Sequence, residues 1–338
     1  MHLFGKDLEN DVAVVAEVGV NHEGNADVAA KLIYAAADAG ADAVKLQSYT
    51  PDRFISAADK DRFARVSKFR LDDAAHERLL AVAKERGIAL FSTAVTEDTV
   101  PLLARLFPAI KVASGDLDFE PVIRSAAATG KPVIISTGNA TLDEVDRAVA
   151  WCRDVLGDGI KERVALMHCV ASYPAPIAQA NVRSVAFMRQ RYGLTTGYSN
   201  HVIETEAVLA AVALGAQLIE VHFTDRKSDR TFRDHSLSFE PQELAALVQS
   251  IRRVRESLGS YDKRPQPSEE PSRAAIRKGL VAARDLAAGT VLAEDDIMYA
   301  RPATEFAARE RPAVVGGTLR ADLKRGQVIP RDAVDVKL

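Results

Sequence analysis

Eight short apolar runs, each followed by a helical segment, constrain this chain more than any other feature. Such runs are typical of strands in a parallel sheet, because helices cover both of its faces. Several of the helices end in a glycine that directly precedes the next strand. Eight such units in about 250 residues predict a closed (β/α)8 TIM barrel rather than an open doubly wound sheet. The expected strands are 11–16, 41–46, 88–92, 109–113, 132–136, 163–168, 194–199 and 217–223.

The helices are expected between these strands and after the last one. The segment from residue 47 to 71 is expected as a long loop through Pro51. No glycine-rich dinucleotide loop or P-loop follows the first strand, and this weakens the open-sheet alternative. The expected helices are 26–40, 72–87, 97–106, 120–130, 142–156, 179–192, 204–214 and 241–258.

The composition changes near residue 263, where a polar, proline-rich stretch begins. We interpret 263–274 as a linker between a barrel domain, residues 1–262, and a small, mostly β domain, residues 275–338. In this tail the pattern Arg-Asp-Leu-x-x-Gly-x-Val-Leu at 284–292 recurs as Ala-Asp-Leu-x-x-Gly-x-Val-Ile at 321–329. This duplication predicts two similar halves.

The overall charge and cysteine content exclude several classes of partner and location. A net charge of −3 gives no electrostatic reason to expect nucleic acid or an anionic membrane as a partner. The two cysteines, Cys152 and Cys169, do not form a disulfide framework and fit a reducing cytoplasm. Neither a signal peptide nor an apolar run of about 20 residues is present, so we expect a cytoplasmic protein.

Two histidines, His201 and His222, follow neighbouring predicted strands. Parallel strands bring their carboxyl ends to one side of a sheet, so both imidazoles are expected there. Two neutral imidazoles can bind one divalent cation and leave positions open for water or substrate. For either histidine alone, a hydrogen-bonded core residue is the competing interpretation.

The other predicted strand ends carry lysines, hydroxyls and carboxylates, which suit an oxyanion such as phosphate. Lys111 lies within an apolar strand, and a buried ammonium needs a partner. Lys45 is also open to interpretation as a solvated lysine or as the Schiff-base lysine of an aldolase. Glu17 either caps a loop or serves proton transfer or a metal-bound water. The strand-end residues are Glu17, Lys45, Gln47, Ser92, Thr93, Lys111, Ser114, Ser136, Thr137, His168, Ser199, His201, Glu220 and His222.

Several blocks of the sequence resemble the sialic acid synthase family. Residues 16–24, AEVGVNHEG, resemble the family's AEIGxNHxG opening, and the tail resembles its antifreeze-like SAF domain. The resemblance covers nearly the whole chain. The other matching blocks are VKLQ at 44–47, FST at 91–93, KVASG at 111–115, ISTG at 135–138, HC at 168–169, YPAP at 173–176, YSNH at 198–201 and HFTDR at 222–226.

The resemblance implies condensation of phosphoenolpyruvate with an acylated amino sugar such as N-acetylmannosamine, which gives a nine-carbon 2-keto sugar acid and phosphate. It makes His201 and His222 the ligands of a divalent cation, usually Mn²⁺, with Mg²⁺ or Co²⁺ as alternatives. It also implies a domain-swapped homodimer in which Arg301 reaches the partner's active site. The residues implied for phosphoenolpyruvate are Lys45, Thr93, Lys111, Ser114, Ser136 and Ser199, and those implied for the sugar or the metal water are Glu17, Gln47, Asp116, Tyr173 and Asp234.

The chain departs from the family pattern mainly where the sugar would lie. Asp116 replaces a Glu, Ala171 an Asn and Asn200 an Asp, TFRDH at 231–235 replaces PGPDH, and RPATE at 301–305 lacks the usual glycines.

We expect catalysis by Glu17, Asp116, His201 and His222, with Glu17 as the proton carrier. The acceptor is N-acetylmannosamine or, alternatively, the 2,4-diacetamido-6-deoxyhexose of legionaminic or pseudaminic acid synthases. A Schiff-base aldolase and a binding module on an inactive barrel are more distant alternatives for the function.

Overall fold

The computed structural model describes residues 1–336, which form two compact units, Met1–Gly259 and a second that begins at Ser260. The first unit is a closed barrel of eight parallel strands, in which the last strand pairs with the first. This confirms the predicted (β/α)8 fold. The strands are β3 (Ala13–Gly19), β4 (Ala43–Ser48), β5 (Ala89–Ala94), β6 (Ile110–Val112), β7 (Val133–Ser136), β8 (Val164–His168), β9 (Thr195–Asn200) and β10 (Leu218–His222).

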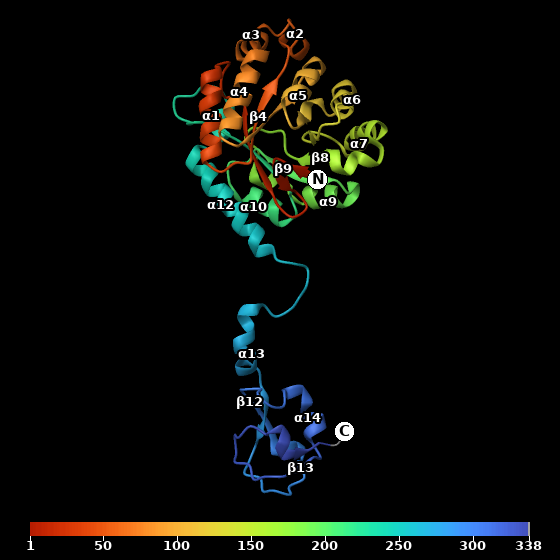
Figure 1. The fold of residues 1–338 in the computed structure, drawn as a ribbon, viewed down its shortest axis with the longest axis vertical. Coiled ribbons are helices and arrows are strands. Elements are labelled where there is room, and N and C mark those ends of the chain that lie inside the picture. The colour runs from red at the N-terminus through yellow and green to blue at the C-terminus, as the bar shows by residue number, and fades with distance from the viewer. Residues whose placement is uncertain (337–338) are drawn as a thin grey trace. The chain divides into compact units, whose positions relative to one another are not determined.

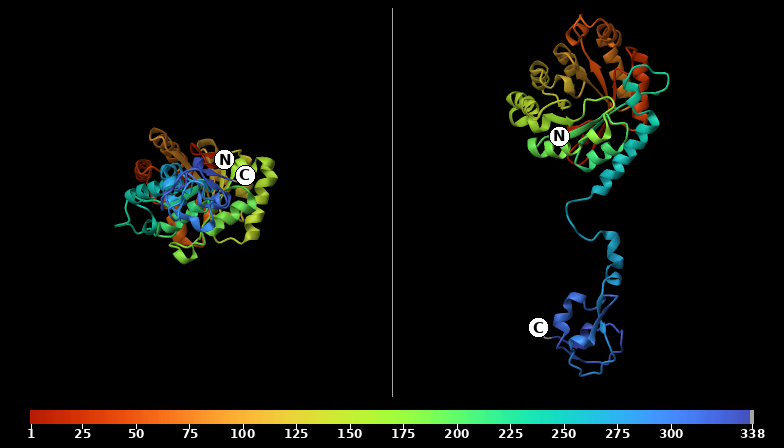
Figure 2. Two further views of the ribbon diagram at one scale, coloured as in Figure 1. Left: turned by 90° about the horizontal axis from the view of Figure 1, so that it is seen from below. Right: turned by 180° about the vertical axis from the view of Figure 1, so that it is seen from behind.

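Helices surround this barrel on the outside (Figures 1 and 2). The first begins where the Asn25 side chain accepts hydrogen bonds from two backbone N–H groups, and it is followed by Gly40 at φ +83°, a conformation that favours glycine. None of the helices described is long and apolar enough to cross a membrane. The main helices are α1 (Ala26–Asp38), α4 (Asp73–Glu85), α5 (Val100–Leu106), α6 (Glu120–Ala128), α7 (Leu142–Leu156), α9 (Arg183–Tyr192), α10 (Glu206–Ala213) and α12 (Pro241–Leu258).

The segment predicted as a long loop after the second barrel strand contains two helices instead, α2 (Pro51–Phe54) and α3 (Lys60–Phe69). The Asp59 side chain accepts a hydrogen bond from the backbone N–H of Arg62 and so caps α3. Val66 and Phe69 are buried in a small aromatic cluster. Packing against the rest of this cluster, which includes residues from distant parts of the chain, stabilises a helix whose other residues are mostly charged or polar, so the prediction of a loop was wrong.

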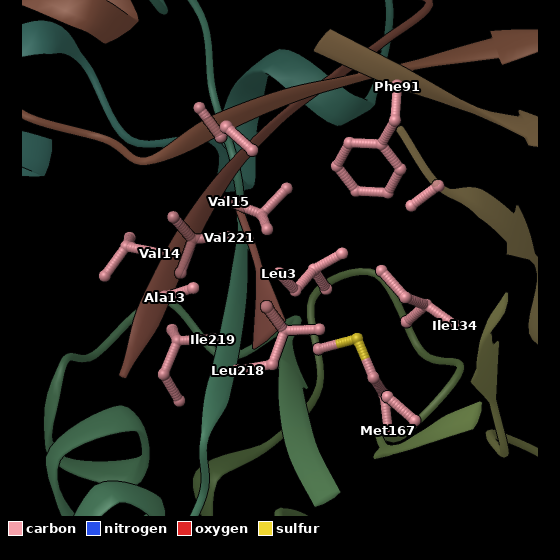
Figure 3. Packing of buried hydrophobic residues seen from close by; sticks show 14 of the residues in the cluster. Leu3, Ala13, Val14, Val15, Phe91, Ile134, Met167, Leu218, Ile219 and Val221 are labelled. Atoms are coloured by element: carbon pink, nitrogen blue, oxygen red, sulfur yellow. The ribbon is translucent and has the colours of Figure 1, made fainter. Parts of the chain in front are cut away.

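The amino-terminal residues form a hairpin that the sequence did not predict, β1 (His2–Leu3) paired with β2 (Lys6–Asp7). Leu3 is buried and belongs to the barrel core, and Figure 3 shows it among Leu218, Met167 and Val15. The ring of Phe4 lies 4.8 Å from that of Phe91, measured between centroids. The hairpin therefore adds apolar contacts to the barrel interior.

The second unit contains two antiparallel pairs, β11 (Gly279–Ala282) with β12 (Ile297–Ala300), and β13 (Thr318–Leu319) with β14 (Val334–Asp335). The predicted duplication is visible in its hydrogen bonds. The backbone N–H groups of Leu286 and Leu323 donate to each other's carbonyl oxygens, both at 2.8 Å. The two halves therefore pair symmetrically at equivalent positions of the repeat. The stretch expected as a linker includes most of a helix, α13 (Glu270–Ile276).

Candidate active site

A cavity of about 1010 Å³ lies where the barrel strands end. Side chains alternate between the two faces of a strand, so residues two apart, such as Glu220 and His222 on β10, both face the interior. Of the predicted site residues, the cavity is lined by Glu17, Lys45, Gln47, Thr93, Lys111, Ser114, Ser136, Tyr173, Ser199, His201, His222 and Asp234.

The floor of the cavity is a buried group of two lysines and two carboxylates. Lys45 Nζ lies 3.1 Å from Glu17 Oε2 and 3.2 Å from Glu220 Oε1. Lys111 Nζ lies 3.1 Å from Glu220 Oε2. All four side chains are at most 6% exposed, so the ion pairs are shielded from water. Lys111 thus has the partner that its place in an apolar strand requires.

The surroundings set the pKa of each of these groups. Burial raises the pKa of Glu17 to about 7, although Lys45 opposes the shift. Burial also acts on Glu220, but the ammonium groups of Lys111 and Lys45 hold its pKa well below the usual range. The pKa of Lys45 is raised, since two carboxylates outweigh its burial. Lys111 has a lowered pKa because burial and the charge of Lys45 outweigh Glu220.

Hydroxyl groups surround this floor. Thr93 Oγ1 accepts a hydrogen bond from Lys45 Nζ at 3.3 Å, and Ser199 donates to Glu220 at 3.0 Å. Ser136 Oγ is buried, and among the described residues it has no hydrogen-bond partner. A buried hydroxyl of this kind is free to bind a ligand that enters the cavity.

The backbone next to Ser114 is closely packed. The N–H of Gly138 donates to Ser114 Oγ at 3.0 Å, and Cys169 Sγ lies 3.1 Å from the same oxygen. A Cβ added at Gly138 would come within 2.7 Å of Cys169 Sγ. Glycine is therefore required there for this wall of the cavity.

His201 and His222 lie next to each other at the ends of the paired strands β9 and β10, with ring centroids 5.4 Å apart. Nδ1 of His201 donates to the backbone carbonyl of Val170 at 2.6 Å, which leaves Nε2 as the free nitrogen of the neutral ring. Burial lowers the pKa of His201 to about 4, and burial together with His201 lowers that of His222. Both rings are neutral at neutral pH.

This pair suits a divalent cation such as Mn²⁺. Neutral imidazole is a good ligand for transition metals, and the carbonyl bond to His201 is the orienting contact that metal-binding histidines usually have. Within residues 1–336 no group of three or more His, Cys, Asp or Glu side chains is arranged to hold a metal. If the two imidazoles bind a cation, water or substrate oxygens would supply its other ligands.

Tyr173 and Asp234 also line the cavity, and Tyr173 lies beside the two histidines. The Tyr173 ring centroid lies 4.2 Å from that of His201, and the Arg233 guanidinium lies 5.1 Å from the Tyr173 centroid. Arg233 also donates to Asp234 at 3.1 Å. Gln47 donates to Glu17 at 3.3 Å, which links the floor to the mouth of the cavity.

Two predicted site residues lie outside the lining of this cavity. Asp116 lies in the 3-10 turn Ser114–Asp116, where burial raises its pKa to about 6. Arg301 is an exposed residue of the second unit, directly after β12. Their predicted roles stay predictions.

Among the lining residues that were not assigned a role from the sequence are Glu220 and Cys169. Glu220 was noted only as a strand-end residue, and strict alternation along β10 was the signal that places it beside His222 on the inner face. His168, the neighbour of Cys169, stacks on Tyr198 with centroids 5.9 Å apart and donates to the carbonyl of Ala180. It is a structural residue, and Cys169 faces the cavity instead.

A closed barrel with a charged cavity at the carboxyl ends of its strands is the architecture of a TIM-barrel enzyme. The NeuB family model matches residues 32–263, and the SAF domain model matches residues 277–335. The chain therefore belongs to the NeuB family, and its tail is a SAF domain.

Several relatives are named as synthases of legionaminic acid, pseudaminic acid or N-acetylneuraminate 9-phosphate. The chain is 34% identical to the N,N'-diacetyllegionaminic acid synthase of Campylobacter jejuni, covering 94% of this chain and 98% of that protein. It is 33% identical to the N-acetylneuraminate-9-phosphate synthase of Drosophila melanogaster, covering 83% and 84%. The crystal structure of N-acetylneuraminic acid synthetase from Leptospira borgpetersenii, in complex with citrate, matches with a TM-score of 0.73 and 32% identity, covering 78% of this chain and 90% of that one.

Proposed function

We propose that this protein condenses phosphoenolpyruvate with an N-acylated amino sugar and releases phosphate and a nine-carbon 2-keto acid. One observation carries the proposal: a buried, hydroxyl-lined pair of lysines lies in the same cavity as two neutral histidines. The first group suits a phosphorylated carboxylic acid, and the second suits a metal that polarises an aldehyde. The membership of the NeuB family supports the same reaction.

The lysines bind the anionic substrate by exchanging partners. In the free protein the Glu220 carboxylate forms ion pairs with both Lys45 and Lys111. These ion pairs keep the two buried ammonium groups close together. The phosphate and carboxylate of phosphoenolpyruvate would share these donors, with the free hydroxyl of Ser136 as a further one. The same contacts hold C3 of the substrate at one place in the cavity. This positioning lowers the activation barrier of the condensation.

The bond-forming step joins C3 of phosphoenolpyruvate to the aldehyde carbon of the sugar. A divalent cation held by His201 and His222 would supply Lewis-acid polarisation of the aldehyde. Glu17, whose pKa of about 7 lets it carry a proton at neutral pH, would donate that proton to the aldehyde oxygen as it becomes a hydroxyl. Water then adds to C2, and phosphate leaves with cleavage of its C–O bond.

Two acceptors are equally supported. N-Acetylmannosamine agrees with the similarity to sialic acid synthetases, and a 2,4-diacetamido-6-deoxyhexose agrees with the similarity to N,N'-diacetyllegionaminic acid synthase. The replacements at Asp116 and at 231–235 affect the region expected for the sugar, so the reaction type is supported more strongly than the acceptor.

We also propose a cytoplasmic homodimer with exchanged SAF domains, in which Arg301 completes the site of the partner. The support is the match of the tail to the SAF domain model and the exposure of Arg301.

The test is phosphate release from phosphoenolpyruvate by metal-stripped protein, before and after Mn²⁺ is restored, with each acceptor in turn and mass detection of the product. We expect release only with metal and acceptor together. The same assay on Lys111→Gln, with Lys227→Gln on the exposed Glu243 pair as the control, tests the cavity floor. Metal-independent release, or borohydride trapping of pyruvate on Lys45, would overturn the proposal in favour of another class of enzyme.

A further inference from the structure

The mouth of the cavity carries more positive charge than the floor described above. Arg62, Arg65 and Lys68 line it from α3, and Arg233 lines it from the segment before α11 (Asp234–Leu237). In the part of the chain that the structure describes, the side chains of Arg62, Arg65 and Lys68 form no ion pair with a carboxylate. Arg62 lies over the Phe54 ring, 5.6 Å from its centroid. These three cations are available to a ligand.

The carboxylates of the mouth do not neutralise this group. Glu23 is shared with Arg230 at 3.8 Å and with His235 at 3.3 Å. Asp234 is paired with Arg233, and Arg65 lies near enough for its charge to act on the same carboxylate without forming an ion pair. The whole chain has a net charge of −3, so the excess of cations at this mouth is local. Like charges that are held together repel one another, and a bound anion relieves that repulsion.

Aromatic packing holds the helix that bears these cations against the cavity. The rings of Phe69 on α3 and Phe232 contact edge to face with centroids 5.4 Å apart. This contact ties the helix that bears Arg62, Arg65 and Lys68 to the segment that bears Arg233. The helix is therefore fixed beside the cavity, and its exposed cations extend from one side of it.

The chemistry of the floor decides which part of the acceptor meets this wall. The aldehyde carbon must lie beside His201 and His222 to react with phosphoenolpyruvate on the lysines. The end of the sugar remote from the aldehyde, C6 of a hexosamine, then extends toward the mouth. Arginine binds phosphate and carboxylate groups bidentately and gains little from a methyl or a hydroxyl group.

We propose that the acceptor is an anionic amino sugar, with a phosphate ester or a carboxylate at the end remote from the aldehyde, bound by Arg62, Arg65 and Lys68. This inference rests on the proposed function and narrows its substrate. The experiment compares condensation rates with N-acetylmannosamine 6-phosphate, N-acetylmannosaminuronic acid, N-acetylmannosamine and a 2,4-diacetamido-6-deoxyhexose. The first two separate phosphate from carboxylate, and the last two are neutral.

We expect kcat/KM for one anionic acceptor to exceed that for both neutral acceptors by roughly 10- to 100-fold for each charge-assisted contact, and to fall with added salt. Arg62→Gln and Arg65→Gln should each reduce this preference at least tenfold. Lys60→Gln, which removes the same charge from α3 outside the cavity lining, should leave the preference unchanged. A neutral sugar that reacts as well as both anionic ones would overturn the inference and leave the proposed function standing.

Calorimetry separates the two proposals if no acceptor reacts, an outcome that would count against the proposed function. N-Acetylmannosamine 6-phosphate is titrated into the full chain with phosphoenolpyruvate present. Binding that the Arg62→Gln/Arg65→Gln protein loses, and the Lys60→Gln protein keeps, supports an anion site at the mouth. Equal binding by all three proteins, or none by the parent, refutes it.

Discussion

Replacing Glu220 with Gln tests how the cavity floor is held together. The change keeps the shape of the side chain but removes the negative charge that both Lys45 and Lys111 contact at about 3.2 and 3.1 Å. At an effective dielectric constant of 20, each of these attractions is about 5 kcal/mol. The variant no longer bears the cost of desolvating the Glu220 carboxylate, which is several kcal/mol. Loss of a proton from one of the lysines limits the remaining destabilisation.

The net expectation is a loss of about 3 kcal/mol in the free energy of unfolding of the ligand-free protein, the lower end for a broken buried ion pair. For a unit of this size the melting temperature should fall by roughly 6–12 °C. Calorimetry or circular dichroism of the full chain measures it. The control is Glu243→Gln, which removes the exposed partner of Lys227 and should cost less than about 1 kcal/mol.

Added phosphoenolpyruvate or inorganic phosphate provides the second measurement. A bound anion replaces the missing charge, so it should raise the melting temperature of Glu220→Gln by more than it raises that of the parent. A variant as stable as the parent, or one that gains no more from the anion, would refute the view that Glu220 holds the lysines ready for an anionic substrate.

Three further predictions address proton transfer, pH dependence and assembly. Glu17→Gln should lower kcat by roughly 10²- to 10⁴-fold, since it removes the proposed proton carrier, and a kinetic assay showing undiminished turnover would exclude that role. Burial lowers the pKa of His76, so the native state excludes a proton that the unfolded chain takes up as the pH falls below 6.5. Stability should therefore decrease below that pH, and in urea titrations of His76→Gln the free energy of unfolding should change less steeply with pH, by up to about 1.4 kcal/mol per pH unit; an unchanged slope would contradict the prediction. If domains are exchanged, equal amounts of inactive Glu17→Gln and Arg301→Ala, refolded together, should regain about a quarter of the parent activity, because half of the dimers then have one intact site; no recovery would argue against exchange.

The barrel could be predicted because its signals are local. Short aliphatic runs and capped amphipathic helices specify each unit, and α7 occupies the predicted residues 142–156. Every barrel strand begins one or two residues later than predicted, and the first three end two or three residues later, which places Glu17 inside β3. The apolar run is only the part of the strand that lies deepest in the barrel, and the polar residues that follow it still pair with their neighbours.

The contacts of the site could not be predicted because they join distant parts of the chain. Lys111 and Glu220 are 109 positions apart and meet only when the barrel closes. The helix α3 was missed since its apolar residues are few, and its stability depends on a partner, Phe232, more than 160 positions away. The cationic mouth is built on that helix, so the sequence did not indicate it either.

The most direct test of the account follows the bridging oxygen of phosphoenolpyruvate. The protein is incubated with Mn²⁺, acceptor and phosphoenolpyruvate whose bridging oxygen is a heavy isotope, and mass spectrometry locates the label. We expect labelled phosphate together with a product that is heavier than the acceptor by one pyruvic acid. Unlabelled phosphate with free pyruvate, and no new carbon–carbon bond, would contradict it.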